Sequence, residues 1–334
     1  MLKKSLWGKR VDPLQGLKPE GISYVLKTKR NFFKLPQMFW TSEIYSLGKA
    51  YRKVLGIPRW LYLPFYSDHG YSALGHMQPH EQENKSNIHI TFNKYRYDKI
   101  RSQTSKKVIY YTHPYIGYRK NNGIELNPNA KGTLVFYSHT IKKVKLCGFD
   151  LEEYLNRLES LPDKYKPFVF IFHVNDILKG SHESFLKKGL PILTAGNQSN
   201  PYFIDRFYDI IRHFKYATSN SGGSELFYCT EMGIEYFIYG KSPKLINEGH
   251  EQNEIGDITE VDELCKNLND EKRRLFCINS QSTSEEKIKF INQSLGIDSE
   301  LESQQFRRLI YREYPKTFLR YIRIIYSRII SDGK

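Results

Sequence analysis

The residues whose types and spacing point most directly to chemistry lie between Ser219 and Ser224, in the sequence SNSGGS. Glycines let a backbone approach a phosphate closely, and hydroxyls add hydrogen-bond donors without a competing negative charge. The apolar pattern places this run between a buried strand and a helix, whose unpaired N–H groups and dipole favour an anion. The alternative is a simple helix cap by Ser221 with glycines for a tight turn. We predict phosphate contacts from Ser219, Asn220, Ser221, Gly222, Gly223 and Ser224.

Further polar residues follow the neighbouring strands predicted in the same half of the chain. Strand-to-helix loops of a parallel sheet meet at one edge, which is where ligands bind. A histidine at that edge can donate a hydrogen bond to a leaving phosphate, and an asparagine can contact the base or ribose. Hydrogen bonding of each histidine to loop backbone is the alternative. The residues predicted at or near this edge are His139, Thr140, His173, Asp176, Gly196, Asn197 and Glu225.

The elements that must position these residues alternate regularly from Lys131 to Gly240. Continuous apolar strands are separated by amphipathic helices, which indicates a parallel sheet covered on both faces. The predicted strands are Thr133–Tyr137, Phe168–His173, Leu190–Thr194, Tyr216–Thr218 and Glu235–Tyr239.

The first half of the chain carries two more polar clusters after predicted strands. Asp68 or His69 could take a proton from a hydroxyl nucleophile. Because they are adjacent in sequence, we treat them as alternatives, and a turn or capping role for Asp68 stays open. His113 and Arg119 form the second cluster, either holding an anionic group or lying on a linker surface. Strands are predicted at residues 60–63, 88–92 and 108–111.

Composition and charge limit the class of protein. The 334 residues carry a formal charge of +15, with 40% hydrophobic and 26% charged residues, so we expect a globular chain with an anionic partner. The four cysteines fall at no metal-ligand or disulfide spacing. The N-terminus lacks the apolar region of a signal peptide, and no run is long enough to cross a membrane. We expect a cytoplasmic protein.

The C-terminal segment predicts a basic amphipathic helix. From Arg307 onward it carries eight basic and two acidic residues, and apolar residues such as Phe318, Ile322 and Ile325 share one face. Such a helix suits an anionic membrane surface, at the inner face of the cytoplasmic membrane. The alternative is a terminal helix that packs on the body of the protein.

The second half resembles the nucleotide-sugar-binding domain of GT-B glycosyltransferases, particularly bacterial enzymes of capsule and lipopolysaccharide assembly. The segments that carry the resemblance are GTLVFYSHT from Gly132, TAGN from Thr194 and ATSNSGGSELFYCTEMGIEYFIYG from Ala217. The resemblance covers residues 131–240 well and the first half only in outline. It implies two facing Rossmann-like domains with parallel sheets, and a C-terminal helix that crosses back to the first domain.

The chain departs from that family at one motif. Many of these enzymes carry a ribose-binding Glu five residues before the Gly that ends the last nucleotide-site helix. Here that glycine is Gly233, the earlier position is Tyr228, and a Pro often found two residues later is Glu235. A serine-rich loop without the ribose Glu is similar to the loop of transferases that use CMP-linked acidic sugars.

The function that the resemblance implies is transfer of a sugar from a nucleotide donor to a surface polysaccharide or lipid-linked oligosaccharide. Residues 1–128 would bind the acceptor, residues 129–298 would bind the donor, and residues 299–334 would form the C-terminal helices. We expect no metal and no cofactor beyond the nucleotide-sugar co-substrate, and either retention or inversion of configuration. The alternatives are a nucleotide-sugar epimerase and a nucleic-acid-binding protein. No RNA or DNA motif supports the latter, so no nucleic-acid partner is expected.

Overall fold

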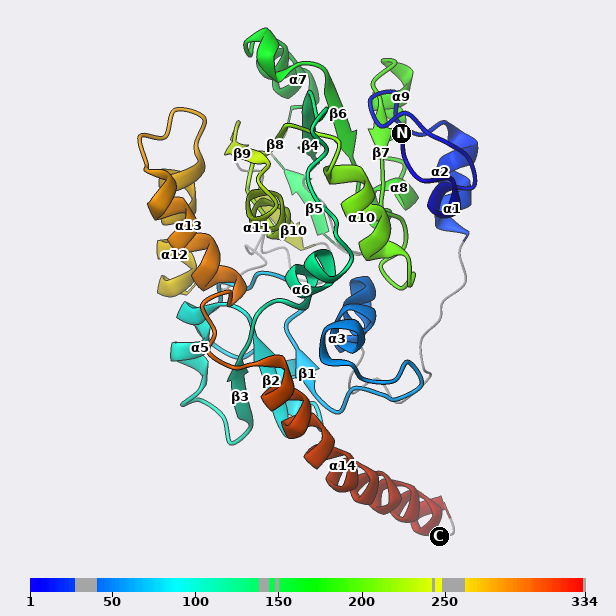
Figure 1. The fold of residues 1–334 in the computed structure, drawn as a ribbon, viewed down its shortest axis with the longest axis vertical. Helices are drawn as coiled ribbons and strands as arrows, with labels where there is room; N and C mark the ends of the chain where they lie inside the picture. The colour runs from blue at the N-terminus through cyan, green and yellow to red at the C-terminus, as the bar shows by residue number, and fades with distance from the viewer. Residues whose placement is uncertain (28–40, 138–143, 148–149, 242–243, 248–261, 333–334) are drawn as a thin grey trace.

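The computed structural model describes residues 1–27, 41–137, 144–147, 150–241, 244–247 and 262–332. Figure 1 shows two α/β bodies, each built on its own sheet. Both of these sheets are parallel, as the alternation of strands and helices predicts.

The larger sheet holds the run of elements that the sequence predicts most clearly. Its five strands are all parallel, in the spatial order β7-β6-β4-β8-β9. The strands are β4 (Thr133–Phe136), β6 (Phe168–Ile171), β7 (Ile192–Leu193), β8 (Tyr216–Ser219) and β9 (Glu235–Ile238). The connecting helices are α7 (Leu151–Glu159), α8 (Val174–Leu178), α9 (Glu183–Lys187), α10 (Phe203–Ile211) and α11 (Ser224–Glu231).

The smaller sheet has three parallel strands in the order β1-β2-β3. The strand predicted at residues 60–63 is wrong, because those residues form a turn and irregular structure and the strand begins at Tyr66. The Leu61 N–H donates to the Pro58 carbonyl at 3.1 Å, so the apolar run begins in a turn and does not join the ladder. The elements here are β1 (Tyr66–Ser67), β2 (Ile88–Thr91), β3 (Lys107–Tyr110), α3 (Leu47–Leu55), α4 (Pro79–Glu83), α5 (Lys94–Ile100) and α6 (Pro114–Asn121).

Two features of the body that contains the larger sheet were not predicted from the sequence. An antiparallel pair of strands, β5 (Val144–Cys147) and β10 (Lys244–Asn247), forms a separate two-stranded sheet. The N-terminal helices α1 (Lys4–Trp7) and α2 (Pro19–Leu26) belong to a segment that packs on the larger sheet. The Leu17 N–H donates to the Ile192 carbonyl at 2.7 Å. The N-terminal segment therefore contacts the larger sheet.

The C-terminal helices bring the chain back to the first domain, which contains the smaller sheet, as expected. Helix α12 (Glu263–Phe276) contacts β9, and α13 (Ser284–Leu295) contacts both α11 and α5. The first turns of α14 (Ser303–Asp332) then pack on α3. Two facing Rossmann-like domains with parallel sheets, and a C-terminal helix that crosses back, confirm the expected GT-B-like fold. No helix in the described part of the chain has the length and apolar character needed to cross a membrane.

Replacing Phe306 with Ala tests whether α14 is an integral part of the first domain. The Phe306 side chain is buried, with its ring centre 4.4 Å from that of Tyr111 and 5.9 Å from that of Phe65. We expect the substitution to lower the free energy of unfolding by about 3–5 kcal/mol, because it leaves a cavity. Urea denaturation measures the change. The matched control is Phe318→Ala on the same helix, which is exposed and should change stability by less than about 0.5 kcal/mol. Equal effects would contradict the packing described.

Candidate functional site

A cavity of about 350 Å³ lies between the two domains. Its walls come from the carboxyl ends of β4, β6, β7 and β8, and from three residues of the first domain. The three residues of the first domain are Tyr45, His69 and Tyr115. The cavity is therefore at the edge of the larger sheet where the sequence predicts ligand binding.

Aromatic side chains form a large part of the cavity wall. Tyr137 and Phe172 stack with ring centres 4.8 Å apart, and Phe203 meets the ring of Tyr45 edge-on at 5.0 Å. Such faces can stack against a planar ring of a ligand. The aromatic lining residues are Tyr45, Tyr115, Phe136, Tyr137, Phe172, Phe203, Phe207 and Tyr228.

The Ser/Gly loop, residues 219–224, forms one side of the cavity. Ser219, Ser221, Gly223 and Ser224 line it, whereas Asn220 and Gly222 do not. Gly222 has φ +68°, a left-handed conformation that an L side chain would strain. Helix α11 is capped by Gly223 without a side-chain bond, so the alternative of a cap by Ser221 is wrong.

The amides of this loop are held by side chains of the loop and of its helix. The Ser219 hydroxyl accepts from the Gly222 N–H at 2.7 Å and from the Tyr236 hydroxyl at 2.7 Å. The Glu225 carboxylate accepts from the Gly223 N–H at 2.7 Å, and Glu225 also lines the cavity. A ligand oxygen that approached Gly223 would compete with this carboxylate.

Two basic residues of α12 bind the other side of the loop, and sequence reasoning missed both. Lys272 Nζ donates to the Gly222 carbonyl at 2.6 Å, and Arg273 Nη2 donates to the Asn220 carbonyl at 3.0 Å. Lys272 is buried, and this desolvation lowers the pKa of its ammonium to about 8. The signal in the sequence is its position on the apolar stripe of α12, between Leu268 and Leu275.

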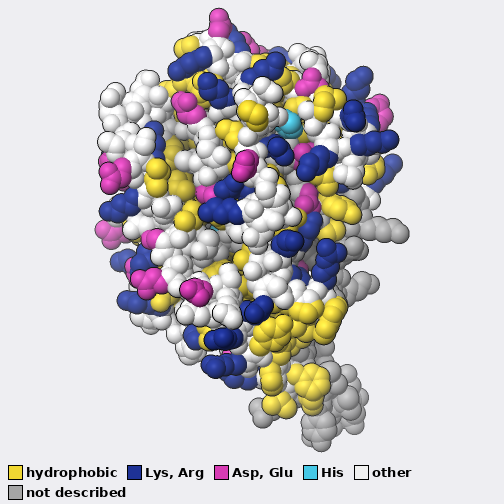
Figure 2. Space-filling view, viewed as in Figure 1, with side chains coloured by type: hydrophobic (Ala, Val, Ile, Leu, Met, Phe, Trp, Pro, Cys, Tyr) yellow, Lys and Arg dark blue, Asp and Glu magenta, His cyan; other side chains and the backbone are white. Residues whose placement is uncertain are grey.

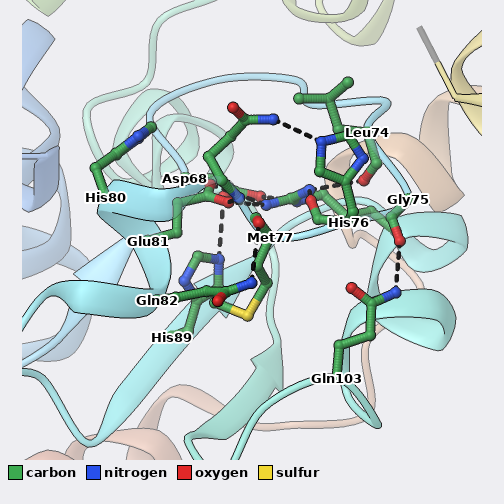
Figure 3. A network of polar contacts seen from close by, with 12 residues as sticks. Asp68, Leu74, Gly75, His76, Met77, His80, Glu81, Gln82, His89 and Gln103 are labelled. Carbon is green, nitrogen blue, oxygen red and sulfur yellow. Dashed lines mark hydrogen bonds and ion pairs between the residues drawn. The ribbon is translucent and has the colours of Figure 1, made fainter. Parts of the chain in front are cut away.

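Asp68 is buried in an ion-pair network away from the cavity wall (Figure 3). Its carboxylate accepts from His89 Nε2 at 3.2 Å and from Arg96 Nε at 3.3 Å. Burial alone would raise the pKa of Asp68, but the charge of Arg96 and the bond from His89 hold it well below its ordinary value. A carboxylate with a lowered pKa is a weak base, so in this arrangement Asp68 is better suited to hold the loop than to accept a proton.

Three side chains of types that bind metal ions lie close to Arg96. Asp68, Glu81 and His89 place ligand atoms within 4.8 Å of one another, the one such group among the described residues. Arg96 Nη2 donates to both oxygens of Glu81, at 2.8 and 2.9 Å, besides its contact with Asp68. A metal ion here would face a buried guanidinium, so the side chains fit an ion pair better than a cation site.

The same guanidinium holds the loop of residues 68–78, which spans the two domains. Arg96 Nη1 donates to the carbonyls of Leu74 and His76 at 2.6 and 2.8 Å. Further along, the Tyr71 N–H donates to Ser224 Oγ at 3.0 Å, and His76 Nδ1 lies 2.9 Å from Asp262 Oδ2. The 68–78 loop thereby connects the first domain to the starts of α11 and α12.

His69 is the residue of this loop that reaches the cavity. Its ring stacks on Tyr45 with centres 5.9 Å apart and planes 17° apart. His173 lies on the other side, with Nε2 3.2 Å from the Tyr45 hydroxyl. Since His173 Nδ1 accepts from the Asn175 N–H, the neutral ring donates from Nε2 to Tyr45. The structure thus brings two of the predicted histidines to one cavity.

Tyr45 was not predicted from sequence, although it joins these histidines. Tyr45 and Ser46 both have positive φ, at 56° and 59°, which is unusual for residues with side chains. The Tyr45 N–H donates to the Gln198 carbonyl at 2.6 Å, and its own carbonyl accepts from the Tyr115 hydroxyl. Such strain is typical of functional sites, where surrounding contacts enforce it.

The remaining predicted residues take varied positions. Gly196 lines the cavity, whereas the Asn197 side chain accepts from the Ser199 N–H at 2.8 Å, and Asp176 is buried outside the lining. Arg119 pairs with both oxygens of Glu231, at 2.7 and 3.0 Å, which joins α6 to α11. His139 and Thr140 lie outside the described residues.

His113 is a structural residue between α6 and α11. It caps α6 through Nδ1, which accepts from the Tyr115 N–H, so Nε2 donates to the Tyr228 hydroxyl at 2.9 Å. Burial lowers the pKa of His113 to about 3. The ring is therefore neutral at ordinary pH and carries no charge for an anionic ligand.

Comparison with known proteins finds similarity to solved structures. No family model and no curated protein matches it. Among solved structures, it is similar to the wall teichoic acid polymerase TagF, with a TM-score of 0.38, 14% identity, and coverage of 76% of this chain and 69% of that one. A second TagF structure, a variant with CDPG, gives a TM-score of 0.36, 11% identity, and coverage of 70% and 57%. The chain thus spans less than two thirds of that second structure.

The neutrality of His113 predicts how stability depends on pH. Because its pKa is about 3 when folded and near 6.5 when unfolded, the unfolded chain binds the extra proton between these values. Stability should therefore fall as pH drops from 6.5, by about 2–3 kcal/mol at pH 4.5 from this residue alone. Urea denaturation at pH 7.5 and 4.5 should show a smaller loss in His113→Asn, which keeps a capping acceptor. Equal losses in both proteins would contradict the assignment.

Proposed function

We propose that this protein is a glycosyltransferase that binds a nucleotide-linked sugar in the cavity between its domains. The observation that carries the proposal is the placement of the Ser/Gly loop and the aromatic wall opposite His69, which comes from the other domain. A two-domain cleft of this kind lets one domain hold the donor and the other present the acceptor.

Each part of the cavity has a role in this proposal. The aromatic walls stack against the nucleobase, and Ser221 and Ser224 donate hydrogen bonds to the donor phosphate. His69 is the base that removes a proton from the acceptor hydroxyl if configuration inverts. The acceptor is a glycan or lipid-linked glycan that approaches from the first domain.

One candidate donor is a CMP-linked acidic sugar. Because Glu225 lines the cavity and its carboxylate accepts from the Gly223 N–H, the sugar carboxylate of such a donor would bind away from Glu225.

A panel of UDP-, GDP- and CMP-linked sugars tests the activity. Titration calorimetry should show saturable binding of at least one donor, and nucleotide release should require a glycan acceptor. Release without any acceptor would indicate an epimerase-type enzyme instead, and no binding at all would contradict the proposal.

Within that assay, His69→Ala separates a catalytic role from a binding role. Loss of a general base should lower the rate of transfer by about 10²–10⁴-fold while donor affinity stays within about threefold. The control is His80→Ala, an exposed histidine of α4 outside the cavity wall. An unchanged rate in His69→Ala would exclude this histidine as the base.

We further propose that α14 binds an anionic membrane surface. Figure 2 shows apolar side chains gathered where the C-terminal helix leaves the body. Phe318, Leu319 and Ile322 are 63%, 58% and 48% exposed, and the basic residues Arg312 and Lys316 are exposed on the preceding turns. Apolar residues beside basic ones match the chemistry of anionic lipid.

Replacing Phe318, Leu319 and Ile322 together with Ser tests the membrane proposal. Cosedimentation with vesicles containing phosphatidylglycerol should fall at least about tenfold, because the apolar contact is lost. The control is Ile288→Ser on α13, which removes another exposed isoleucine and should leave binding unchanged. Equal binding by wild type and triple variant would instead support a helix that serves only to pack on the first domain.

A further inference from the structure

Two cations of α12 lie directly behind the Ser/Gly loop, on the side away from the cavity wall. Lys272 binds the Gly222 carbonyl and Arg273 binds the Asn220 carbonyl, at 2.6 and 3.0 Å. Both carbonyls belong to peptide groups within the loop, so both cations are one peptide unit from the cavity.

These two contacts decide which way the loop amides point. In a planar trans peptide the C=O and the next N–H point in opposite directions. Since the Gly222 carbonyl points to Lys272, the Gly223 N–H points away from α12, and the same relation turns the Ser221 N–H away from Arg273. Ser221 and Gly223 both line the cavity, where the Ser221 N–H donates to Ser219 Oγ at 3.4 Å and the Gly223 N–H donates to the Glu225 carboxylate at 2.7 Å.

Burying the charged side chain of Lys272 destabilises the folded protein unless another group stabilises that charge. Among the residues that the structure describes, no carboxylate forms an ion pair with its ammonium, and the charge of Glu225 only partly offsets the effect of burial on its pKa. Desolvation of an ammonium without such a partner opposes folding. An apolar residue at this position of the stripe would pack without that penalty.

We propose that Lys272 and Arg273 are positioning residues for the donor phosphate, which they attract through the two peptide units of the Ser/Gly loop. The proposal rests on the proposed function, because it assumes a phosphorylated ligand in the cavity. The cations orient the Ser221 and Gly223 N–H groups, polarise them and supply positive potential behind them.

Glu225 fits this arrangement as the group that a phosphate replaces. Its carboxylate accepts from the Gly223 N–H at 2.7 Å, so that N–H already binds an anionic oxygen. A phosphate oxygen that binds the same N–H takes the place of the Glu225 carboxylate. The positive charges of Lys272 and Arg273 behind the loop stabilise either anion.

Titration of UDP, GDP and CDP into wild type and Lys272→Met tests the proposal. The nucleoside diphosphate that binds wild type should bind Lys272→Met at least about tenfold more weakly, because one unit of charge near the phosphate is lost. Competition by the matching nucleoside, which has no phosphate, should change by less than about twofold. A merely structural role would weaken both ligands together.

Three further variants make the result specific. Lys272→Arg keeps the charge and should stay within about threefold of wild type. Lys266→Met removes an exposed lysine of the same helix and should have no effect. Arg273→Gln, at a partly exposed position, should weaken binding of the diphosphate about three- to tenfold and serves if Lys272→Met does not fold.

The pH dependence of diphosphate affinity is a second measurement, and a purely structural role of Lys272 would not change it. The groups facing Lys272 are Glu225 of α11, Cys265 and Arg273 of α12, and the ring of Tyr71. Burial raises the pKa of Cys265 and of Tyr71, whereas it lowers the pKa of Lys272 to about 8. Wild-type affinity for the diphosphate should therefore fall as pH rises above 8, and Lys272→Arg should show a flat profile to pH 9.5.

The outcomes separate this inference from the proposed function. If wild type binds none of the nucleotides, the proposed function fails and this inference fails with it. If wild type binds a diphosphate but Lys272→Met and Arg273→Gln bind it equally well, only the inference is wrong. Parallel pH profiles for wild type and Lys272→Arg would also overturn it.

Discussion

The contact on which the rest of the site depends is the buried pairing of Arg96 with Asp68 and Glu81. Charges this deeply buried are stable only when every partner is present, so the three side chains fix one another's positions. The same guanidinium binds two carbonyls of the 68–78 loop and so holds this loop on the first domain. His69 follows directly after Asp68, and its place at the cavity is a consequence of that anchor.

The 68–78 loop also determines how the two domains meet. Its contacts with Ser224 and Asp262 fall at the starts of α11 and α12, the helices that carry or support the Ser/Gly loop. Tyr71 stacks on Phe227 of α11 with ring centres 4.1 Å apart, which adds an apolar contact to the polar ones. The cavity is therefore a shared product of both domains. Chemistry between two bound substrates requires such an arrangement, because neither domain alone surrounds the reacting atoms.

Sequence periodicity predicted the larger sheet well, because strands buried on both faces read as continuous apolar runs. It also identified the Ser/Gly loop, whose glycines and hydroxyls are adjacent in the chain. It failed at Trp60–Leu63, where an apolar run flanked by prolines was taken for a strand. Local pattern cannot report that a run lacks a neighbouring strand to pair with, since that is a tertiary property.

The site residues that sequence reasoning missed are those whose partners lie far away in the chain. Lys272 acts on a carbonyl 50 positions earlier, and Tyr45 meets His173 across 128 positions. One local signal was nevertheless present, because Lys272 occupies a position of the apolar stripe where a leucine would satisfy the helix. A charge on a buried stripe opposes folding, and natural sequences tolerate such local conflicts mainly at functional sites. The burial of Lys272 is therefore better explained by a phosphate on the cavity side of the Gly222–Gly223 peptide than by the packing of α12.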